Sequence, residues 1–215
     1  KDGAIVGTTA NEQLNTFLTS NKLYGDFILE LEYKVNPNMN SGIQIRSNSY
    51  PHYMDGRVHG YQIEIDPSER GWSAGIYDEA RRGWLHPVAD DNTAAKKAFK
   101  QNDWNHYRVE AIGDTIRTWI NGVPAAHLMD DQTASGFIGL QVHGIYGDQK
   151  PGTEIAWRNI RILTDNLEKY AQKSPLLVVD KINKLTSNEA KQGWKMLWDG
   201  ETTNGWRGAK LDTFP

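Results

Sequence analysis

The chain has 215 residues, of which 38% are hydrophobic, enough for one sizeable β domain or for a domain with an appendage. Its formal net charge of −3 at pH 7 argues against nucleic acid or another polyanion as the main partner. No basic block suggests an electrostatic membrane contact, and no apolar run approaches the ~18 residues that span a bilayer.

The first residues, KDGAIVG, read as the middle of a strand and turn region. This predicts a fragment or a processed form, for which the lack of a visible signal peptide says nothing about export. Cysteine is absent, so no disulfide pattern indicates a compartment. Eight Trp, nine Tyr and 20 Gly suit a sugar-binding β protein, although aromatic residues are also common in cores.

Segments in which apolar and polar residues alternate follow one another up to about residue 163. The predicted strands are 27–35, 41–47, 60–66, 106–113, 115–122, 136–144 and 155–163. Gly113-Asp114 and Asn121-Gly122 are tight-turn signals beside two of them. Because no long helical pattern separates the strands, we expect an all-β fold in which two antiparallel sheets form a sandwich over residues 1–164.

The character of the chain changes after Thr164. The segments 165–173 and 186–192 are short, polar and compatible with helices, and Thr186 with Glu189 has the spacing of a capping box. We expect the apolar stretch PLLVVDKI, residues 175–182, to pack on the sandwich. Residues 165–192 are thus predicted to be a linker with short helices, and residues 193–215 return to a strand and turn composition.

The polar faces of the predicted strands carry an unusual set of side chains. If the apolar residues point inward, one outer face collects a guanidinium, an imidazole, carboxylates and three amides, supplied by Gln44, Arg46, Gln62, Glu64, Asp66, Gln141 and His143. Amides offer both donors and acceptors, which suits recognition of sugar hydroxyls. The alternative is an ordinary solvated sheet.

Two acids follow each other on this face. Glu64 and Asp66 lie roughly 6–7 Å apart along the strand, a spacing compatible with two-carboxylate glycoside hydrolysis. Asp66 precedes Pro67 and Ser68, so a turn-capping role suits it better, and Glu64 is the preferred acid or base. His143 could share proton transfer, or be structural. Arg46 could bind an oxyanion or a sugar oxygen, or form an ion pair with Glu64.

The loop GWSAGIYDEARRGW, residues 71–84, follows the acidic strand and is predicted to wall the groove. Tyr77 and Trp84 are the better candidates for stacking on sugar rings, with Asp78 and Arg82 as further substrate contacts. No zinc spacing, calcium loop, phosphate loop or Gly-x-Ser-x-Gly elbow occurs. No metal is therefore predicted at the site, and a structural calcium ion, which sandwich lectins can hold, is not indicated.

Several motifs together resemble a known family. WNHYRVEAIGDTIRTWINGVPAA, GFIGLQVH and WRNIRIL occur in the order found in the concanavalin A-like (laminin-G-like) jelly roll. With DGAIVG, GDFILELEYKV, NSGIQIRS, GYQIEID and GIYDEARRGWL, the chain resembles the 3-keto-disaccharide hydrolase family over nearly all of residues 2–163. The resemblance implies a jelly roll, an oligosaccharide or glycoside substrate, and a location in the periplasm or at the cell surface.

The resemblance also implies an enzyme that cleaves 3-keto-glycosides by proton abstraction, elimination and hydration. Such a reaction needs a base, a group that stabilises an enolate and a proton donor, and it requires no cofactor. We assign Glu64 as base, Arg46 with Gln62 as enolate or hydroxyl contacts, and His143 as the second acid or base. Two alternatives stay open: a non-catalytic carbohydrate-binding module, and an ordinary two-carboxylate glycosidase.

The segment GWKMLWDGETTNGWRGA, residues 193–209, resembles the opening strand and turn of the same family. One interpretation is that a second, tandem domain begins here. The other is that residues 193–208 supply a first strand to the sandwich, either within one chain or by exchange with a second chain, because pairing would satisfy an open sheet edge.

Overall fold

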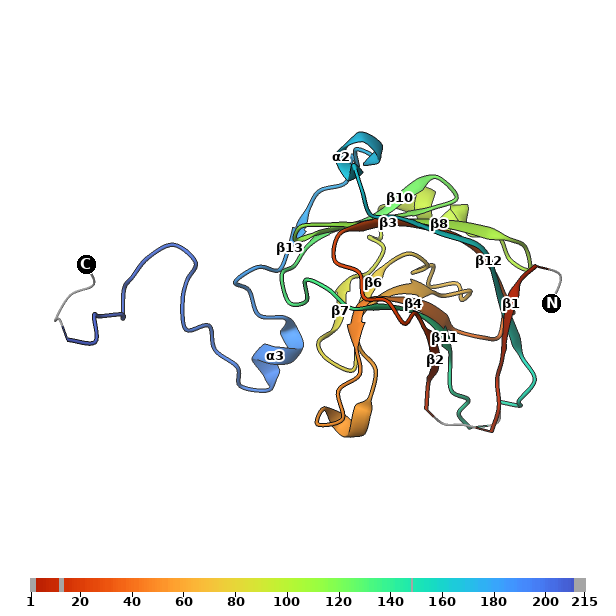
Figure 1. Ribbon diagram of the computed structural model, residues 1–215, viewed down its shortest axis with the longest axis horizontal. Coiled ribbons are helices and arrows are strands. Elements are labelled where there is room, and N and C mark those ends of the chain that lie inside the picture. Colours follow the sequence, from red (N-terminus) through yellow and green to blue (C-terminus); the bar gives the residue numbers. More distant parts are fainter. Residues whose placement is uncertain (1–2, 12–13, 148, 211–215) are drawn as a thin grey trace.

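The protein is a two-layer β sandwich (Figure 1), and its computed structural model describes residues 3–11, 14–147 and 149–210. The seven-stranded sheet has the order β1 (Ile5–Thr8), β12 (Glu154–Leu163), β3 (Phe27–Val35), β8 (Asn105–Ile112), β9 (Thr115–Ile120), β10 (Val123–Met129) and β13 (Val179–Asp180). The six-stranded sheet has the order β2 (Thr16–Thr19), β11 (Phe137–Val142), β4 (Ser41–Asn48), β5 (His59–Ile65), β6 (Ile76–Glu79) and β7 (Gly83–His86).

Paired strands in both sheets are antiparallel, except that β13 runs parallel to β10. The predicted all-β sandwich is therefore confirmed. The predicted tight turns are also present: Gly113 and Asp114 join β8 to β9, and Asn121 and Gly122 join β9 to β10. Asn121 and Gly122 have φ values of 49° and 82°, a left-handed conformation that Asn and Gly tolerate.

The core lies between the sheets and follows the alternation of the sequence. On β3, Phe27, Leu29 and Leu31 are at most 1% exposed, and they face the isoleucines of β4 and β5. Glu30 on the same strand points outward and forms ion pairs with Arg108 and Arg161. Since the apolar set of β5 fills the core, its alternate residues must lie on the outer face of the six-stranded sheet.

A bulge in β4 breaks this alternation at Arg46. The register of β4 against β5 shifts between Ile45 and Asn48, and Arg46 has a φ of 45°. Its buried guanidinium donates hydrogen bonds of 2.8 Å to the carbonyls of Gly25 and Gly113 and to Asp26. The prediction that Arg46 shares the polar face with Gln44, or pairs with Glu64, is therefore wrong.

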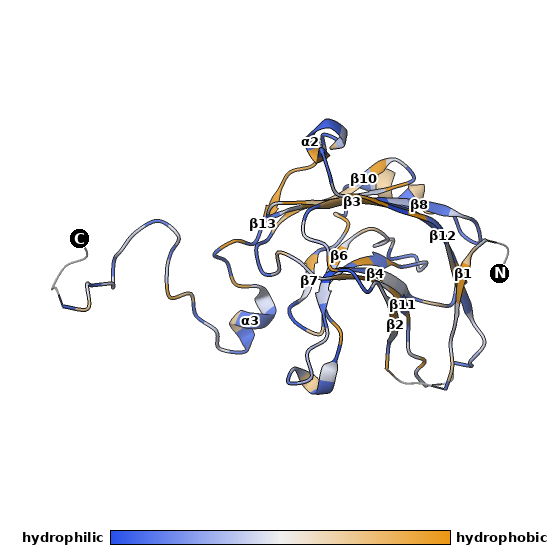
Figure 2. Cartoon of the chain, in the orientation of Figure 1, coloured by the Kyte–Doolittle hydropathy of each residue, from blue (hydrophilic) through white to orange (hydrophobic). Residues whose placement is uncertain are grey.

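Helices are short and lie outside the two layers. They are η1 (Met54–Gly56), α1 (Thr93–Ala98), α2 (Leu167–Tyr170) and α3 (Ser187–Lys191), and α2 and α3 are largely hydrophilic (Figure 2). The predicted capping box is present, because Thr186 and Glu189 hydrogen-bond reciprocally at the start of α3. Within the 175–182 stretch, β13 pairs with β10 through Val179 and Asp180, whereas Leu177 is 91% exposed. Within the described part of the chain, no helix has the length and apolar character needed to cross a membrane.

The segment that follows α3 extends away from the sandwich (Figure 1). Residues 193–210 contain no strand, and Trp194, Leu197, Trp198 and Trp206 are exposed. Completion of the sandwich within one chain, and the predicted strand itself, are therefore wrong for residues 193–210, while residues 211–215 lie outside the described part. Exchange between chains and the start of a second domain remain predictions.

Candidate functional site

A network of amide side chains covers the outer face of the six-stranded sheet. Gln62 on β5 lies at its centre, and its Oε1 accepts hydrogen bonds from Gln44 on β4 (2.7 Å) and Gln141 on β11 (2.9 Å). Its Nε2 donates to Glu64 (3.0 Å). Ser47 donates to Gln44 at 2.7 Å, so donors and acceptors alternate from Ser47 to the carboxylate. Three strands thus hold Glu64 through a buried polar chain.

The lack of a side chain at Gly42 leaves the space that the Gln62 side chain occupies. Gly42 pairs with Glu64 across β4 and β5, and a Cβ at position 42 would lie 2.5 Å from the Gln62 side chain. Any larger residue would therefore displace Gln62 and, with it, the hydrogen bond to Glu64.

Glu64 is a buried carboxylate with polar partners on three sides. It is 4% exposed, and besides Gln62 it accepts a 2.6 Å hydrogen bond from Asn40, in the turn before β4. Arg70 approaches to 3.6 Å. Burial raises the pKa of Glu64 to about 7, and the hydrogen bonds from Asn40 and Gln62 offset only part of that effect. Near neutral pH the group is poised to accept or to release a proton.

The raised pKa of Glu64 predicts a pH-dependent stability difference. A carboxyl that titrates near 4.5 when unfolded and about 7 when folded stabilises the protein below pH 4.5, and this contribution is lost as the pH rises through 7. In Glu64→Gln this position no longer titrates, so the variant does not lose this stability as the pH rises. The free energy of unfolding of the variant minus that of the wild type should therefore rise by about 2–3 kcal/mol between pH 5 and 8.5. Urea unfolding at both pH values measures this, and a constant difference would contradict it.

Arg70 and a group of aromatic rings form one wall beside Glu64. The Arg70 guanidinium donates to Asp66 at 2.8 Å and lies over the ring of Trp72 at 4.3 Å. Trp84 packs edge-on against both Trp72 and Tyr77, with centroid distances of 4.6 and 5.2 Å. Asp66 also accepts from the backbone N–H of Ser68, the turn-capping role suggested by the sequence. Asp66 therefore holds the Arg70 side chain beside Glu64.

A second buried carboxylate, Glu79, forms the opposite wall. It is 6% exposed and lies 3.6 Å from Arg57, while Asn15 donates to it at 3.5 Å. Burial raises its pKa, and the nearby positive charge of Arg57 lowers it in part. Burial also raises the pKa of Tyr77, with a further contribution from the charges of Glu79 and Glu64. Tyr77 is thus within electrostatic reach of both acids.

These walls and the floor enclose a pocket of about 300 Å³, the small end of the range for small-molecule sites. We call it the central pocket. The predicted site residues that line it are Gln62, Glu64, Tyr77, Trp84, Gln141 and His143. His143 hydrogen-bonds through Nδ1 to the Gly144 carbonyl at 2.7 Å. Gln44 lies fully buried in the floor network, and Asp66 acts through Arg70.

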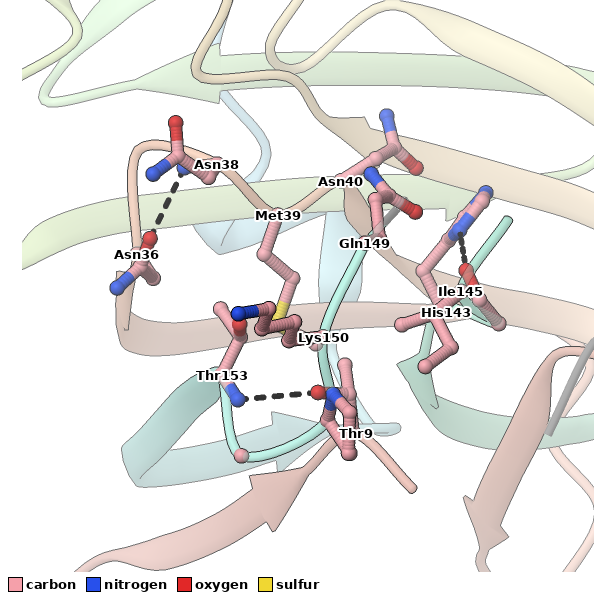
Figure 3. Close-up of a pocket in the computed structure, with 13 residues that line it drawn as sticks. Thr9, Asn36, Asn38, Met39, Asn40, His143, Ile145, Gln149, Lys150 and Thr153 are labelled. Carbon is pink, nitrogen blue, oxygen red and sulfur yellow. Dashed lines mark hydrogen bonds between the residues drawn. The ribbon is translucent and has the colours of Figure 1, made fainter. Parts of the chain in front are cut away.

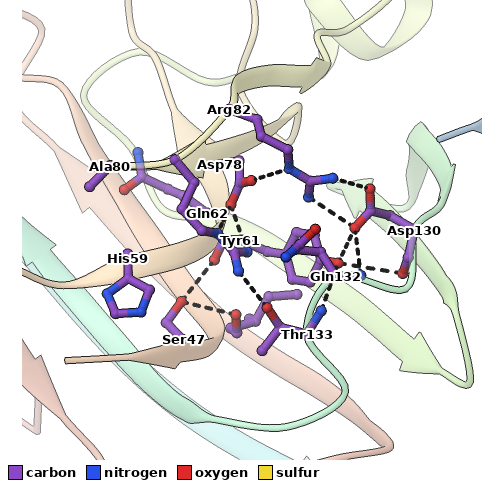
Figure 4. Close-up of polar contacts among 12 residues, drawn as sticks. Ser47, His59, Tyr61, Gln62, Asp78, Ala80, Arg82, Asp130, Gln132 and Thr133 are labelled. Atoms are coloured by element: carbon purple, nitrogen blue, oxygen red, sulfur yellow. Dashed lines mark hydrogen bonds and ion pairs between the residues drawn. The ribbon is translucent and has the colours of Figure 1, made fainter. Parts of the chain in front are cut away.

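Asp78 and Arg82 do not reach the central pocket. Asp78 pairs across the sheet with Tyr61, whose ring is in the core, so its side chain points inward (Figure 4). It binds Arg82 at 2.6 Å, and Arg82 forms two hydrogen bonds to Asp130 at 2.7 and 2.9 Å. The prediction that Asp78 and Arg82 contact substrate beside Trp84 is therefore wrong, because these residues join the two sheets at the end of the core.

Five lining residues were not predicted: Asn15, Asn40, Arg57, Arg70 and Glu79. A sequence signal existed for Glu79, because it lies two residues after Tyr77 on β6 and so shares its face, whereas Asp78 does not. The other four lie in turns and loops, where alternation gives no direction. In the described part of the chain, no group of three His, Asp or Glu side chains could hold a metal ion.

A sandwich whose outer face carries amides, aromatic rings and two buried acids defines a protein of the carbohydrate-binding or carbohydrate-cleaving jelly-roll class. The family model described as "3-keto-alpha-glucoside-1,2-lyase-like domain" matches residues 1–163, and the chain belongs to this family. The expected family and jelly-roll fold are therefore confirmed. No curated protein matches the chain.

Solved structures agree with the jelly-roll fold. A candidate glycosyl hydrolase from Parabacteroides distasonis is 21% identical, with 76% of this chain and 88% of that chain covered and a TM-score of 0.53. A Bacillus subtilis protein with a galectin-like fold is 10% identical, with 76% and 90% covered and a TM-score of 0.55. A B. subtilis carbohydrate-binding module, CBM66, is 15% identical, with 74% and 94% covered and a TM-score of 0.50. At these identities the likeness shows the fold.

Proposed function

We propose that the protein cleaves the glycosidic bond of 3-keto-glycosides at the central pocket. The observation that carries this proposal is Glu64, a buried carboxylate with a pKa of about 7, fixed by Asn40 and Gln62 at the floor of a pocket of sugar size. A general base works best when its pKa lies near the working pH. The family description, a 1,2-lyase of 3-keto-glucosides, fits a base that acts beside the ketone.

The reaction begins with transfer of the C2 proton to Glu64. The C3 ketone makes this proton acidic, and the electron pair of the broken C–H bond passes into an enolate. Re-formation of the ketone then expels the C1 substituent and leaves a double bond between C1 and C2. Water adds across that bond, with its hydroxyl on C1 and its proton on C2, so the net reaction is hydrolysis. The ketone is itself the electron sink, and the route requires no cofactor.

The remaining roles fall to residues around Glu64. Arg70, held by Asp66 and Trp72, is the cation nearest the base, and we give it the enolate contact that the sequence had suggested for Arg46. We assign Glu79 as the group that protonates the leaving oxygen, because it lines the pocket and burial raises its pKa, and His143 lies on the same pocket as a second donor. Trp84 and Tyr77 form the wall on which a sugar ring stacks. We place this activity in the periplasm or at the cell surface.

A comparison of oxidised and unoxidised substrates tests the proposal. We expect aglycone release from methyl and 4-nitrophenyl 3-keto-glucosides and none from the plain glucosides. In D₂O the product should carry deuterium at C2, because the solvent supplies that proton. Release from the plain glucosides, without deuterium, would identify a two-carboxylate glycosidase instead. Binding of glucosides with no release from either form would identify a carbohydrate-binding module, the reading that the likeness to CBM66 favours.

A further inference from the structure

Two further hollows of different chemistry adjoin the central pocket and share lining residues with it. One, of about 640 Å³, shares Asn40 and His143 with it, and we call this hollow the polar arm. The other, of about 820 Å³, shares Asn15, Arg57 and Glu79 with it, and we call this hollow the apolar arm. Asn40, the hydrogen-bond partner of Glu64, therefore borders the polar arm, and Glu79 borders the apolar arm.

The polar arm is lined by amides from two turns. Asn36, Asn38 and Asn40 come from the turn between β3 and β4, and Gln149 faces them from the segment before β12 (Figure 3). Asn36 accepts a hydrogen bond from the Asn38 backbone, which fixes the turn. Such a surface matches the hydroxyl groups of a sugar.

The apolar arm offers hydrocarbon and aromatic surface instead. Phe17 on β2, Met54 in η1, Val58 before β5 and Tyr146 line it, and Met54 and Tyr146 are 55% and 53% exposed. These residues come from three separate segments and face one hollow. An aromatic ring would remove their apolar surface from water. Among the described lining residues, Thr16 and Asp55 are the polar side chains that the arm offers a second sugar beyond those shared with the central pocket.

We propose that the apolar arm is the aglycone site and that it selects glycosides of aromatic alcohols. This inference rests on the proposed function for its orientation: the sugar lies over Gln62 and Glu64, and the aromatic aglycone lies beyond Glu79, which faces the bond to be cleaved. Phe17 and Met54 then determine specificity without touching the reacting atoms.

Paired substrates and paired variants test the aglycone site. The 4-nitrophenyl 3-keto-glucoside should have a kcat/KM at least tenfold above that of the methyl 3-keto-glucoside. Met54→Ala and Phe17→Ala should each reduce this ratio by about tenfold, mainly through a higher KM for the 4-nitrophenyl substrate. Leu18→Ala is the matched control, because Leu18 is exposed on the same strand but lines a different hollow. Met54 is itself exposed, so its truncation does not threaten folding.

Binding of the unoxidised glucosides separates this inference from the proposed function. The 4-nitrophenyl glucoside should bind at least tenfold more tightly than the methyl glucoside in calorimetry, and Met54→Ala should abolish the difference. If neither keto substrate reacts but this difference holds, the aglycone site stands and the proposed reaction fails. If both keto substrates react at equal rates and both glucosides bind equally, the reaction stands and the aglycone site is overturned.

Discussion

Glu64→Gln should lower kcat/KM for a 3-keto-glucoside by about 10²–10⁴-fold, the range for loss of a general acid or base. The amide keeps the size of the side chain but cannot accept the C2 proton. Affinity for an unoxidised glucoside should change little, since Gln62 and Trp84 remain in place. Aglycone release measured beside calorimetric binding checks both statements. Full activity in the variant would show that another group removes the proton.

The dependence of kcat/KM on pH is a second test of Glu64 as the base. Glu64 must be deprotonated to act, so kcat/KM of the wild type should rise as the pH approaches about 7, and it should fall again at the higher pH at which Glu79, the proposed proton donor, loses its proton. Glu32→Gln is the matched control, because Glu32 lies on the outer face of the other sheet, paired with Arg158 at 2.7 Å. Its activity and pH profile should match the wild type. A wild-type profile that is flat between pH 5 and 9 would contradict the role of Glu64.

Strand alternation predicted the floor of the site because one face of each strand had to fill the core. The isoleucines of β5 fix the direction of Gln62 and Glu64, and the same argument applied to β11 brings in Gln141. Applied to β6, it would have selected Glu79 and rejected Asp78. An interpretation of residues 71–84 as one irregular loop hides this alternation, and it therefore selects Asp78 instead of Glu79.

The positions of other side chains at the site cannot be predicted from the pattern of the residues around them in the sequence. Arg46 leaves the polar face because a bulge gives it a positive φ, a conformation that its residue type does not favour. Arg70 reaches Glu64 only because Asp66 and Trp72 hold it, and Arg57 meets Glu79 from another loop. These contacts depend on the path of loops in three dimensions, whereas period-2 patterns describe only residues within a strand.

Arg82→Met should destabilise the fold by about 3–5 kcal/mol, although Arg82 was predicted to bind substrate. Met fills much of the volume but leaves the buried Asp130 without its arginine, while Asp78 keeps the ion pair with Arg81 at 2.7 Å. Burial raises the pKa of Asp130, yet hydrogen bonds from Arg82 and Tyr61 outweigh it and hold that pKa below its usual value. The deficit should therefore shrink as the pH falls and Asp130 of the variant takes up a proton. Urea unfolding at pH 7.5 and 5 measures both effects.

A comparison of Arg57→Met with Arg82→Met distinguishes an arginine that lines the pocket, Arg57, from one that stabilises the fold, Arg82. Arg57 is 46% exposed and 3.6 Å from Glu79, so its loss should change stability by less than about 1 kcal/mol. Turnover of a 3-keto-glucoside should nevertheless change, because the charge beside the proton donor is gone. The folded fraction of Arg82→Met should keep wild-type kcat/KM, because Arg82 does not line the pocket. A stable Arg82→Met protein with impaired substrate binding would show that Arg82 contacts substrate. The substrate site would then lie between the sheets and not on the outer face of the six-stranded sheet.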